Sequence, residues 1–321
     1  MSSSDPDGHG ADTTTDQLIE GVDLGGRVAL VTGASGGLGA ETARALASCG
    51  AAVTLTARDV AKAEGVAEGI RSSTGNARVD VLELELTDPA NIRAAAKRWL
   101  GGHDELHFLV NNAGVMACPL ERTAEGFELQ LATNHFGHFL LTGLLVPLLR
   151  KSAPSRIVNL SSAGHRMSDV VLDDLHYENR PYDKWEAYGQ SKTANILFSV
   201  ELNRRLVGGG VTANAVHPGM ILTELGRHLD EADIQELMSR RPDRSEMKWK
   251  SVEEGAATSV WACLASELEG RGGLYLEDCH VAAQKESDET VEGYASWVMN
   301  ADTASRLWDV SEQAVGERFE F

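Results

Sequence analysis

The sequence predicts an α/β fold with a doubly wound parallel sheet in a single domain. A short apolar, β-branched run at 28–32 leads into a glycine-rich turn and then into a helix-forming stretch. Similar apolar runs recur along the chain, each followed by a helical stretch, which is typical of βαβ units. The 321 residues are 42% hydrophobic and 24% charged, as expected for a globular chain with an ample core.

The first unit is Val28–Gly39, VALVTGASGGLG, which precedes a helix-forming stretch at 40–48. Glycine accepts positive φ and lets a backbone approach another molecule closely. A turn from strand to helix also points free N–H groups and the positive end of a helix dipole at the space above it, which favours a pyrophosphate. A tight connection without a ligand is the alternative, and the motif alone does not decide between them.

The second strand is expected at 51–57 and ends beside Arg58 and Asp59. At this strand end of a dinucleotide fold, an acidic residue holds the ribose 2′-hydroxyl of NAD, whereas an arginine accommodates the 2′-phosphate of NADP. Arg58 therefore predicts NADP(H) in preference to NAD(H). The alternative is that Arg58 is a solvated surface residue and Asp59 is a helix N-cap.

Further strands and helices follow in alternation. Strands are expected at 79–86, 106–110 and 156–160, and helices at 60–71, from Thr87-Asp88-Pro89 onward, across the apolar stretch 124–150, and at 185–206. The carboxyl ends of parallel strands meet at one edge of a sheet, where ligands bind. We therefore expect the Gly33 turn, Arg58, Glu85 and residues 111–114 to lie together.

Histidine and cysteine usage predicts no metal site. His135 and His138 are three positions apart without a third ligand, so we interpret them as packing or partner-interface residues. The cysteines are far apart and form no C-x-x-C pair: Cys49, Cys118, Cys263 and Cys279. This usage fits a reducing compartment and predicts a cytoplasmic protein.

The formal net charge of −19 argues against nucleic acid and anionic membranes as partners, because both attract basic surfaces. No window approaches the run of about 20 apolar residues that spans a bilayer, so we expect no membrane anchor. Residues 1–22 are polar and acidic and are expected to form a disordered tail. The folded domain is then 23–321.

Tyr188 and Lys192 are four residues apart on the helix expected at 185–206, so they share one face of it. Taken alone, a tyrosine and a lysine at this spacing indicate a surface pair whose apolar stems lie along the helix. Their significance depends on the other motifs of the chain.

Six features, in this order and at these spacings, resemble the short-chain dehydrogenase/reductase family: Thr32-Gly33-x-x-x-Gly37-x-Gly39, Asn111-Asn112-Ala113-Gly114, Asn134, Ser162, Tyr188-x-x-x-Lys192 and Pro218-Gly219. The text NNAGVMACP, NHFGHFLL, YGQSKTANILF and VHPG is similar to the retinol-dehydrogenase-like and WW-domain-oxidoreductase-like branch. The resemblance covers about 25–279 and implies a Rossmann-type sheet.

The resemblance implies a catalytic role for Asn134, Ser162, Tyr188 and Lys192. Tyr188 would be the general acid/base, with its pKa lowered by the Lys192 ammonium and by the nicotinamide. Ser162 would hydrogen-bond the substrate oxygen, with Ser161 as the alternative if the register is off by one. Asn134 would hold a water in a proton relay toward Lys192.

The same resemblance implies a set of NADP-binding residues. These are Gly33, Ser35, Gly36, Gly37, Leu38, Gly39, Arg58, Glu85, Leu86, Asn112, Ala113, Gly114, Tyr188, Lys192, Pro218, Gly219 and Thr223. Ser35 and Arg58 would hold the 2′-phosphate, and the Pro218–Thr223 turn would close over the nicotinamide. Glu85 is a departure, since the family usually has an aspartate contacting adenine there.

The substrate side is expected around the catalytic residues. Met167, Tyr182, Trp185 and Met220 are candidate pocket residues beside Ser162, and their aromatic and thioether groups suit an apolar substrate. Core packing is the alternative for each of them. A charge-rich stretch at 223–251 is expected to form a small helical lid, and helices at about 290–315 to cap the domain.

These features predict an NADP-dependent oxidoreductase that interconverts an alcohol and its carbonyl on a small lipophilic substrate, such as a steroid, a retinoid-like aldehyde or a bulky ketone. The alternative from another class is a catalytically silent nucleotide-sensing protein of the same fold, which commonly lacks part of the Asn, Ser, Tyr, Lys set. Epimerisation or dehydration is less favoured by the glycine spacing. The resemblance also implies a homo-oligomer, a dimer or tetramer, through the helices that carry Asn134 and Tyr188.

Overall fold

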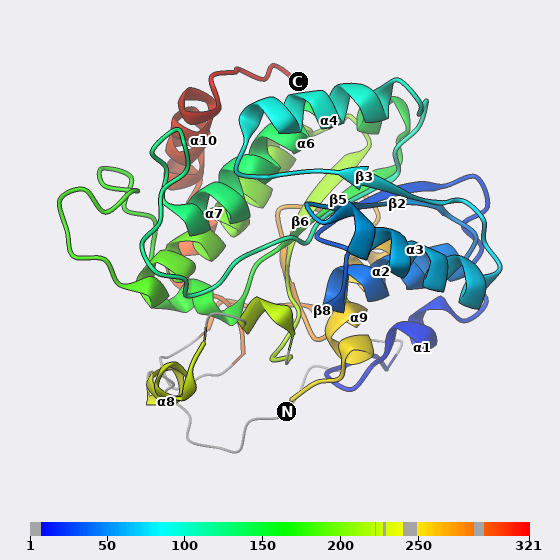
Figure 1. Cartoon of the computed structure of the whole chain (residues 1–321), viewed down its shortest axis with the longest axis horizontal. Helices are drawn as coiled ribbons and strands as arrows, with labels where there is room; N and C mark the ends of the chain where they lie inside the picture. Colours follow the sequence, from blue (N-terminus) through cyan, green and yellow to red (C-terminus); the bar gives the residue numbers. More distant parts are fainter. Residues whose placement is uncertain (1–7, 222, 227–228, 240–248, 286–291) are drawn as a thin grey trace.

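The computed structural model describes residues 8–221, 223–226, 229–239, 249–285 and 292–321. They form one sheet with the strand order β3-β2-β1-β4-β5-β6-β7-β8, parallel except for the final β7–β8 pair (Figure 1). The strands are β1 (Val28–Thr32), β2 (Ala52–Ala57), β3 (Val79–Glu83), β4 (Phe108–Asn111), β5 (Ser155–Leu160), β6 (Val211–His217), β7 (Tyr275–Glu277) and β8 (His280–Val281). The predicted doubly wound parallel sheet is confirmed.

Strand β1 lies between β2 and β4, so the direction in which the sheet grows reverses beside it. Its residues from Ala29 to Thr32 are buried, which explains the continuous apolar run in the sequence. In open α/β sheets the connections after such a switch point diverge to opposite faces and leave a crevice at the carboxyl ends of the strands. The chain therefore has its ligand-binding edge where β1 and β4 end.

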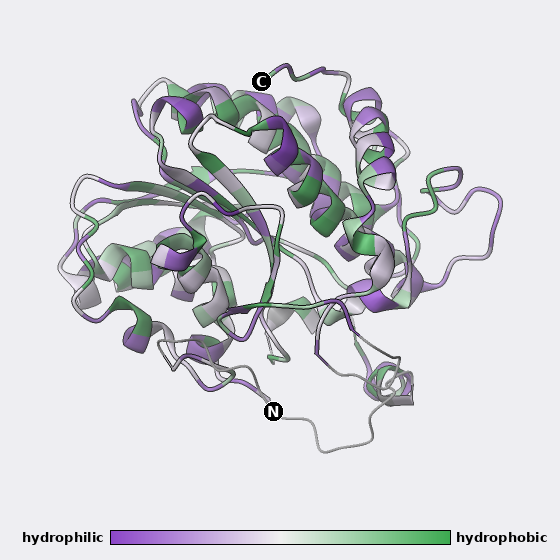
Figure 2. Cartoon of the chain, turned by 180° about the vertical axis from the view of Figure 1, so that it is seen from behind, coloured by the Kyte–Doolittle hydropathy of each residue, from purple (hydrophilic) through white to green (hydrophobic). Residues whose placement is uncertain are grey.

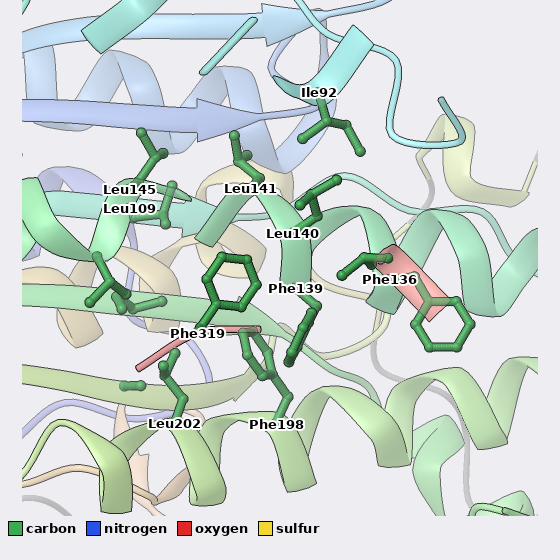
Figure 3. Packing of buried hydrophobic residues seen from close by; sticks show 14 of the residues in the cluster. Ile92, Leu109, Phe136, Phe139, Leu140, Leu141, Leu145, Phe198, Leu202 and Phe319 are labelled. Carbon is green, nitrogen blue, oxygen red and sulfur yellow. The ribbon is translucent and has the colours of Figure 1, made fainter. Parts of the chain in front are cut away.

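Two layers of helices cover the sheet. One face carries α1 (Thr15–Ile19), α2 (Gly37–Ser48), α3 (Val60–Thr74) and α9 (Val252–Leu264), and the other carries α4 (Pro89–Leu100), α6 (Gly137–Lys151), α7 (Lys184–Arg205) and α10 (Ala301–Val315). In the reverse view each layer presents both hydrophobic and hydrophilic residues, as amphipathic helices do (Figure 2). The larger apolar cluster joins α6 and α7, where Phe139 packs against Phe198, and it extends to Leu140 and Ile92 on the side of α4 (Figure 3).

The apolar stretch within 124–150 forms the long buried helix that we expected, but the helix begins at Leu129 and is not α-helical throughout. Helix α5 (Leu129–Leu131) begins after Glu128, whose carboxylate accepts hydrogen bonds from the backbone N–H groups of Gln130 and Leu131. A π-helical segment, η1 (Ala132–Phe136), follows and continues directly into α6. Residues 124–128 lie outside the helix because Gly126 adopts a positive φ.

The prediction of disorder up to residue 22 is wrong for the part of the tail that the structure describes. Helix α1 packs against α2 and α9, and the buried Thr15 hydroxyl donates to the Glu41 carboxylate. Arg44 also forms an ion pair with Asp16 at 2.6 Å. These contacts give the segment tertiary partners that composition alone does not reveal. Residues 1–7 lie outside the described part of the chain.

Helix α10 and the C-terminal residues cover the outer side of α6 and α7. The Trp308 ring lies 4.8 Å from the Phe139 ring, and a Cβ added at Gly143 would come within 2.4 Å of Phe319. Every residue of α7 from Ala187 to Ser199 is buried within the single chain. The helix faces through which we expected subunits to pair are therefore occupied by this chain's own C-terminus.

Replacing Trp308 with Ala should destabilise the protein by about 3–5 kcal/mol, because the change opens a cavity between α10 and α7. Urea unfolding measures this difference as a shift of the midpoint at constant slope. The control is Arg306→Ala on the same helix, where the side chain is 65% exposed and the change should stay within about 0.5 kcal/mol. Equal effects of the two changes would contradict the packing described here.

Candidate active site

A cavity of about 1330 Å³ runs along the carboxyl ends of the strands. It begins at Arg58 and Glu85 beyond β2 and β3, passes the β1 turn and Asn112, and reaches Ser162 and Glu277 beyond β5 and β7. All of the predicted site residues line it except Gly39, Asn134 and Tyr182. Most of the residues predicted from the sequence therefore line the cavity, and these three lie outside its lining.

The glycine turn fits a close-lying pyrophosphate. Gly33 has φ +65°, and a Cβ there would lie 2.7 Å from the Cα of Ala113. Gly37 also has a positive φ and opens α2, whose first N–H groups lack partners within the helix. Gly39 does not line the cavity because a Cβ there would meet the Asn112 amide at 2.4 Å, so this glycine lets α2 pack against the β4 end.

Thr32 connects the glycine turn to β4 and to the π-helical segment. Its hydroxyl accepts hydrogen bonds from the backbone N–H groups of Asn112 and Ala113 at 2.9 and 3.0 Å. The hydroxyl also lies 2.8 Å from His138 Nε2, and His138 Nδ1 lies 3.0 Å from the Asn134 carbonyl oxygen. Since a carbonyl can only accept, Nδ1 carries the proton and Nε2 accepts from Thr32. His138 thus links the Thr32 hydroxyl to the Asn134 backbone through its two ring nitrogens.

The end of the cavity beside β2, where we expect the adenosine, is lined by cations. Arg58 lies there with a side chain that is 66% exposed, and Ser35 and Lys62 line the same end. The Nζ atom of Lys62 lies 4.0 Å from the Cβ position of Gly36, so a second cation faces the glycine turn. Lys62 was missed in the sequence, where its position one helical turn after Arg58 could have indicated it. Asp59 caps α3 by accepting from Lys62 N, as the alternative interpretation held for this residue.

Glu85 lines the cavity, but other groups engage its carboxylate. Its Oε1 atom accepts from both the backbone N–H and the hydroxyl of Thr87, at 3.0 and 2.8 Å. Its Oε2 atom lies 3.7 Å from Arg58 Nε. This arrangement orients the carboxylate along the loop after β3, and the neighbouring Leu86 lines the cavity.

The catalytic candidates Ser162, Tyr188 and Lys192 converge at the middle of the cavity. The Ser162 side chain hydrogen-bonds that of Tyr188, while the Ser161 hydroxyl donates to the Lys192 carbonyl instead. Lys192 Nζ donates to the Leu160 carbonyl at 3.0 Å and lies 5.7 Å from the Tyr188 ring centroid. Both serines line the cavity, but Ser162 is the one whose side chain is paired with Tyr188.

Burial shifts the pKa of both Tyr188 and Lys192 toward their neutral forms. Desolvation raises the pKa of Tyr188 to about 12 against the opposing effect of the Ser162 hydrogen bond, and it lowers the pKa of Lys192 to about 8. In the protein alone, burial is the largest cause of the shift in the Tyr188 pKa, and the lowering that we expected from Lys192 together with the nicotinamide stays a prediction. The phenol is therefore held as a proton donor.

Asn134 supports the site from outside the cavity. Its amide accepts from Val115 N at 2.8 Å and donates to the Val115 carbonyl and to the Ser191 hydroxyl. The side-chain oxygen and the backbone carbonyl oxygen of Asn134 each accept one hydrogen bond, so each has a lone pair left for a water. The predicted role of Asn134 in a water relay stays a prediction.

Met167, Trp185 and Met220 line the cavity, and their contact with a substrate stays a prediction. Tyr182 is not part of the lining, because its hydroxyl donates to Cys118 O and lies within hydrogen-bond distance of Glu128 and Gln130. In the expected lid, α8 (Glu231–Ser239) is tied to α7 by a Lys184–Asp233 ion pair.

The apolar lid residues divide into two groups. Leu225 and Leu237 line the cavity, whereas Ile234 is 44% exposed. Residues 240–248 of the expected lid lie outside the described part of the chain.

The far end of the cavity carries polar residues that the sequence did not indicate. Arg166 and Glu277 form a largely buried pair at 4.0 Å, and Lys250 pairs with Asp278 at 2.5 Å. Trp297 lines the cavity beside them. These residues come from the loop after β5, from the segment before α9, from the β7 end and from the C-terminal region, so only the tertiary fold brings them together.

Gly164→Ala should disable the site, because a Cβ at Gly164 would lie 2.6 Å from Tyr188 Cε1 and would displace the ring. We expect kcat to fall by roughly a hundredfold, a loss that small displacements of catalytic groups can cause. The control is Gly65→Ala on α3, where the structure shows open space and alanine favours the helix. A Gly164→Ala protein with full activity would mean that Tyr188 is not held at this position.

Three buried histidines should make the protein acid-sensitive. Burial lowers the pKa of His135 to about 3, of His138 to about 4 and of His165 to about 3. Below pH ~6.5 the unfolded chain binds protons that the folded chain does not, so stability falls by about 1.4 kcal/mol per pH unit for each histidine. Urea unfolding near pH 7 and near pH 5 measures this loss, and equal stability at both would contradict it.

Within the described residues, no helix is both long and apolar enough to cross a bilayer, and no three potential ligands cluster as a metal site would require. The four cysteines are buried, and none of them forms a disulfide in the part of the chain that the structure describes.

Known proteins match the whole architecture. A family model described as short chain dehydrogenase matches residues 27–234. Human "Retinol dehydrogenase 12" is 45% identical over 93% of this chain and 89% of its own length. A solved structure of an uncharacterized protein from Mycobacterium paratuberculosis has a TM-score of 0.73 at 32% identity and covers 97% of this chain and 100% of its own.

A second solved structure is described as a Pseudomonas aeruginosa RhlG/NADP active-site complex. It has a TM-score of 0.63 at 27% identity over 79% of this chain and 95% of its own. The family model and the 45% identity confirm the resemblance on which the sequence prediction rested. The chain therefore belongs to the short-chain dehydrogenase/reductase family, in its retinol-dehydrogenase-like branch.

Proposed function

We propose that the protein is an NADP-dependent oxidoreductase that interconverts an alcohol and its carbonyl on an apolar substrate, with Tyr188 as the general acid/base. The observation that carries the proposal is the convergence of Ser162, Tyr188 and Lys192 in one cavity beside the glycine turn. The family to which the chain belongs supports the oxidoreductase chemistry.

The residues along the cavity fit NADP. The Gly33–Gly37 turn and the α2 N-terminus would hold the pyrophosphate, and Arg58, Lys62 and Ser35 would hold the 2′-phosphate. Arg58 and Glu85 are partly exposed and 3.7 Å apart, so their ion pair is weak enough for Arg58 to exchange it for a phosphate. When bound, the nicotinamide supplies or accepts the hydride.

Carbonyl reduction follows from the protonation states of the site. The Ser162 hydroxyl would donate to the substrate oxygen and orient the carbonyl carbon. As negative charge develops on that oxygen, Tyr188 would give up its phenol proton, and the Lys192 ammonium would stabilise the phenolate that remains. Oxidation of an alcohol runs through the same groups in reverse.

The apolar lining supports a lipophilic substrate. Met116, Met167, Trp185, Met220, Leu225 and Leu237 line the cavity near the catalytic residues. The similarity to a retinol dehydrogenase favours a bulky alcohol or aldehyde of retinoid- or steroid-like size. We further propose that any homo-oligomer forms through a surface other than the covered faces of α6 and α7, and that the protein is cytoplasmic.

Tyr188→Phe should lower turnover by at least about a hundredfold and leave NADP affinity nearly unchanged, because only the proton-transferring oxygen is lost. Steady-state kinetics and calorimetric NADP binding measure the two quantities. Tyr177→Phe is the matched control, since among the described residues the buried Tyr177 hydroxyl has no hydrogen-bond partner. Retained activity in the Tyr188→Phe protein would remove the acid/base assignment.

Arg58→Asp should shift the cofactor preference toward NAD by about tenfold or more, because hydrogen bonds to charged groups contribute about 1.5–3 kcal/mol each. The ratio of kcat/KM for NADP and NAD measures the preference. Arg306→Asp makes the same change of charge on α10, outside the cavity, and should leave the ratio unchanged. An unchanged ratio in Arg58→Asp would exclude Arg58 from the 2′-phosphate site.

A further inference from the structure

Three side chains hold one extended segment, Gly293–Ala295, against the active site. Arg166 Nη2 donates to the Gly293 carbonyl at 2.5 Å, and the Gly293 N–H donates to Glu277 Oε1 at 2.6 Å. The Ala295 N–H donates to His165 Nε2 at 3.1 Å. His165 and Arg166 both belong to the short helix η2 (Ala163–Met167), which directly follows Ser162.

Residues 293–299, here called the C-terminal wall, close the substrate end of the cavity. Trp297 lines the cavity, and Val298 is buried behind it. Gly293 has φ +87°, and a Cβ there would lie 2.5 Å from the Ala283 carbonyl oxygen, so the start of the wall fits tightly against the chain below it. The wall is therefore a packed element with a defined position.

His165 connects this wall to the catalytic serine. Its side chain is fully buried, and Nδ1 lies 2.6 Å from the Ser162 carbonyl oxygen. A backbone N–H can only donate, so Nε2 must be the acceptor for Ala295, and Nδ1 must carry the proton that is donated to Ser162. Burial lowers the pKa of His165 to about 3, which keeps the ring in this neutral tautomer at working pH.

We propose that His165 is a positioning residue, which holds the backbone of Ser162 in register with the C-terminal wall and thereby sets the serine hydroxyl against the substrate carbonyl. This inference rests on the proposed function, since it assigns a role within the same site. The hydrogen bond from Nδ1 holds the Ser162 carbonyl, and the hydrogen bond to Nε2 holds the Ala295 N–H of the C-terminal wall.

The two hydrogen bonds can be removed separately. Asparagine places an amide near the position of Nδ1 and can donate to the Ser162 carbonyl, but it does not extend to Ala295. Glutamine places an amide oxygen near the position of Nε2 and can accept from Ala295, but it loses the donor to Ser162. A positioning role therefore predicts opposite kinetic effects for His165→Asn and His165→Gln.

We expect His165→Gln to lower kcat by about tenfold or more with KM little changed, because the serine loses its orientation. We expect His165→Asn to keep kcat within about threefold and to raise KM for a bulky alcohol, because the wall loosens. The matched control is His107→Gln at the opposite edge of the sheet. There His107 accepts the Val28 N–H at 3.1 Å, and its loss should reduce stability without affecting either kinetic constant.

The ring tautomer provides a readout independent of turnover. The ¹⁵N shifts of the His165 ring, assigned by their absence in His165→Gln, should show Nδ1 protonated and Nε2 unprotonated. An Nε2–H tautomer, or equal changes of kcat and KM in both variants, would overturn the positioning role. If the wild-type protein turns over no alcohol while the tautomer is as expected, the proposed function has failed. The two hydrogen bonds of His165 would then exist without a catalytic role, and the positioning role would be overturned as well.

Discussion

The close approach of β1 and β4 at the switch point of the sheet determines the geometry of the whole site. The Thr32 hydroxyl binds two backbone N–H groups of the β4 end and donates to His138, which in turn holds the Asn134 carbonyl. This chain of hydrogen bonds runs from the glycine turn to the π-helical segment. The glycine turn and the segment that carries Asn134 are therefore positioned by one buried network of hydrogen bonds.

Water exclusion governs the chemistry of the site. Burial raises the pKa of Tyr188 to about 12 and lowers that of Lys192 to about 8, so near neutral pH the phenol is protonated and Lys192 is still mostly an ammonium. A low-dielectric site of this kind strengthens every charge interaction that a bound molecule introduces. In the proposed reaction, Tyr188 would be the proton donor, Lys192 would be the cation beside it, and the charge that develops on the substrate oxygen would draw the proton.

The fold and most of the cavity could be predicted from the sequence because their signals are local. The strand–turn–helix unit at Gly33 and the pair Tyr188 and Lys192 are short-range patterns that backbone geometry converts directly into position. The role of Tyr182 and the order of residues 8–22 depend instead on partners far away in the chain, namely Cys118, Glu41 and Arg44.

Two further features could not be read from the sequence for the same reason. The π-helical segment at Asn134 follows from side-chain bonds to Val115 and Ser191. The covering of α6 and α7 follows from Trp308 and Phe319, which close back from the C-terminus.

Reduction of the nicotinamide by the purified protein, with NADP and NAD in parallel over a panel of retinoid, steroid and simple aliphatic alcohols, tests the central claim most directly. The arrangement of Ser162, Tyr188 and Lys192 beside a cationic adenosine end predicts turnover with NADP, fastest on a bulky apolar alcohol. Tight NADP binding without turnover of any alcohol or carbonyl would contradict the assignment and would favour a nucleotide-sensing protein of the same fold.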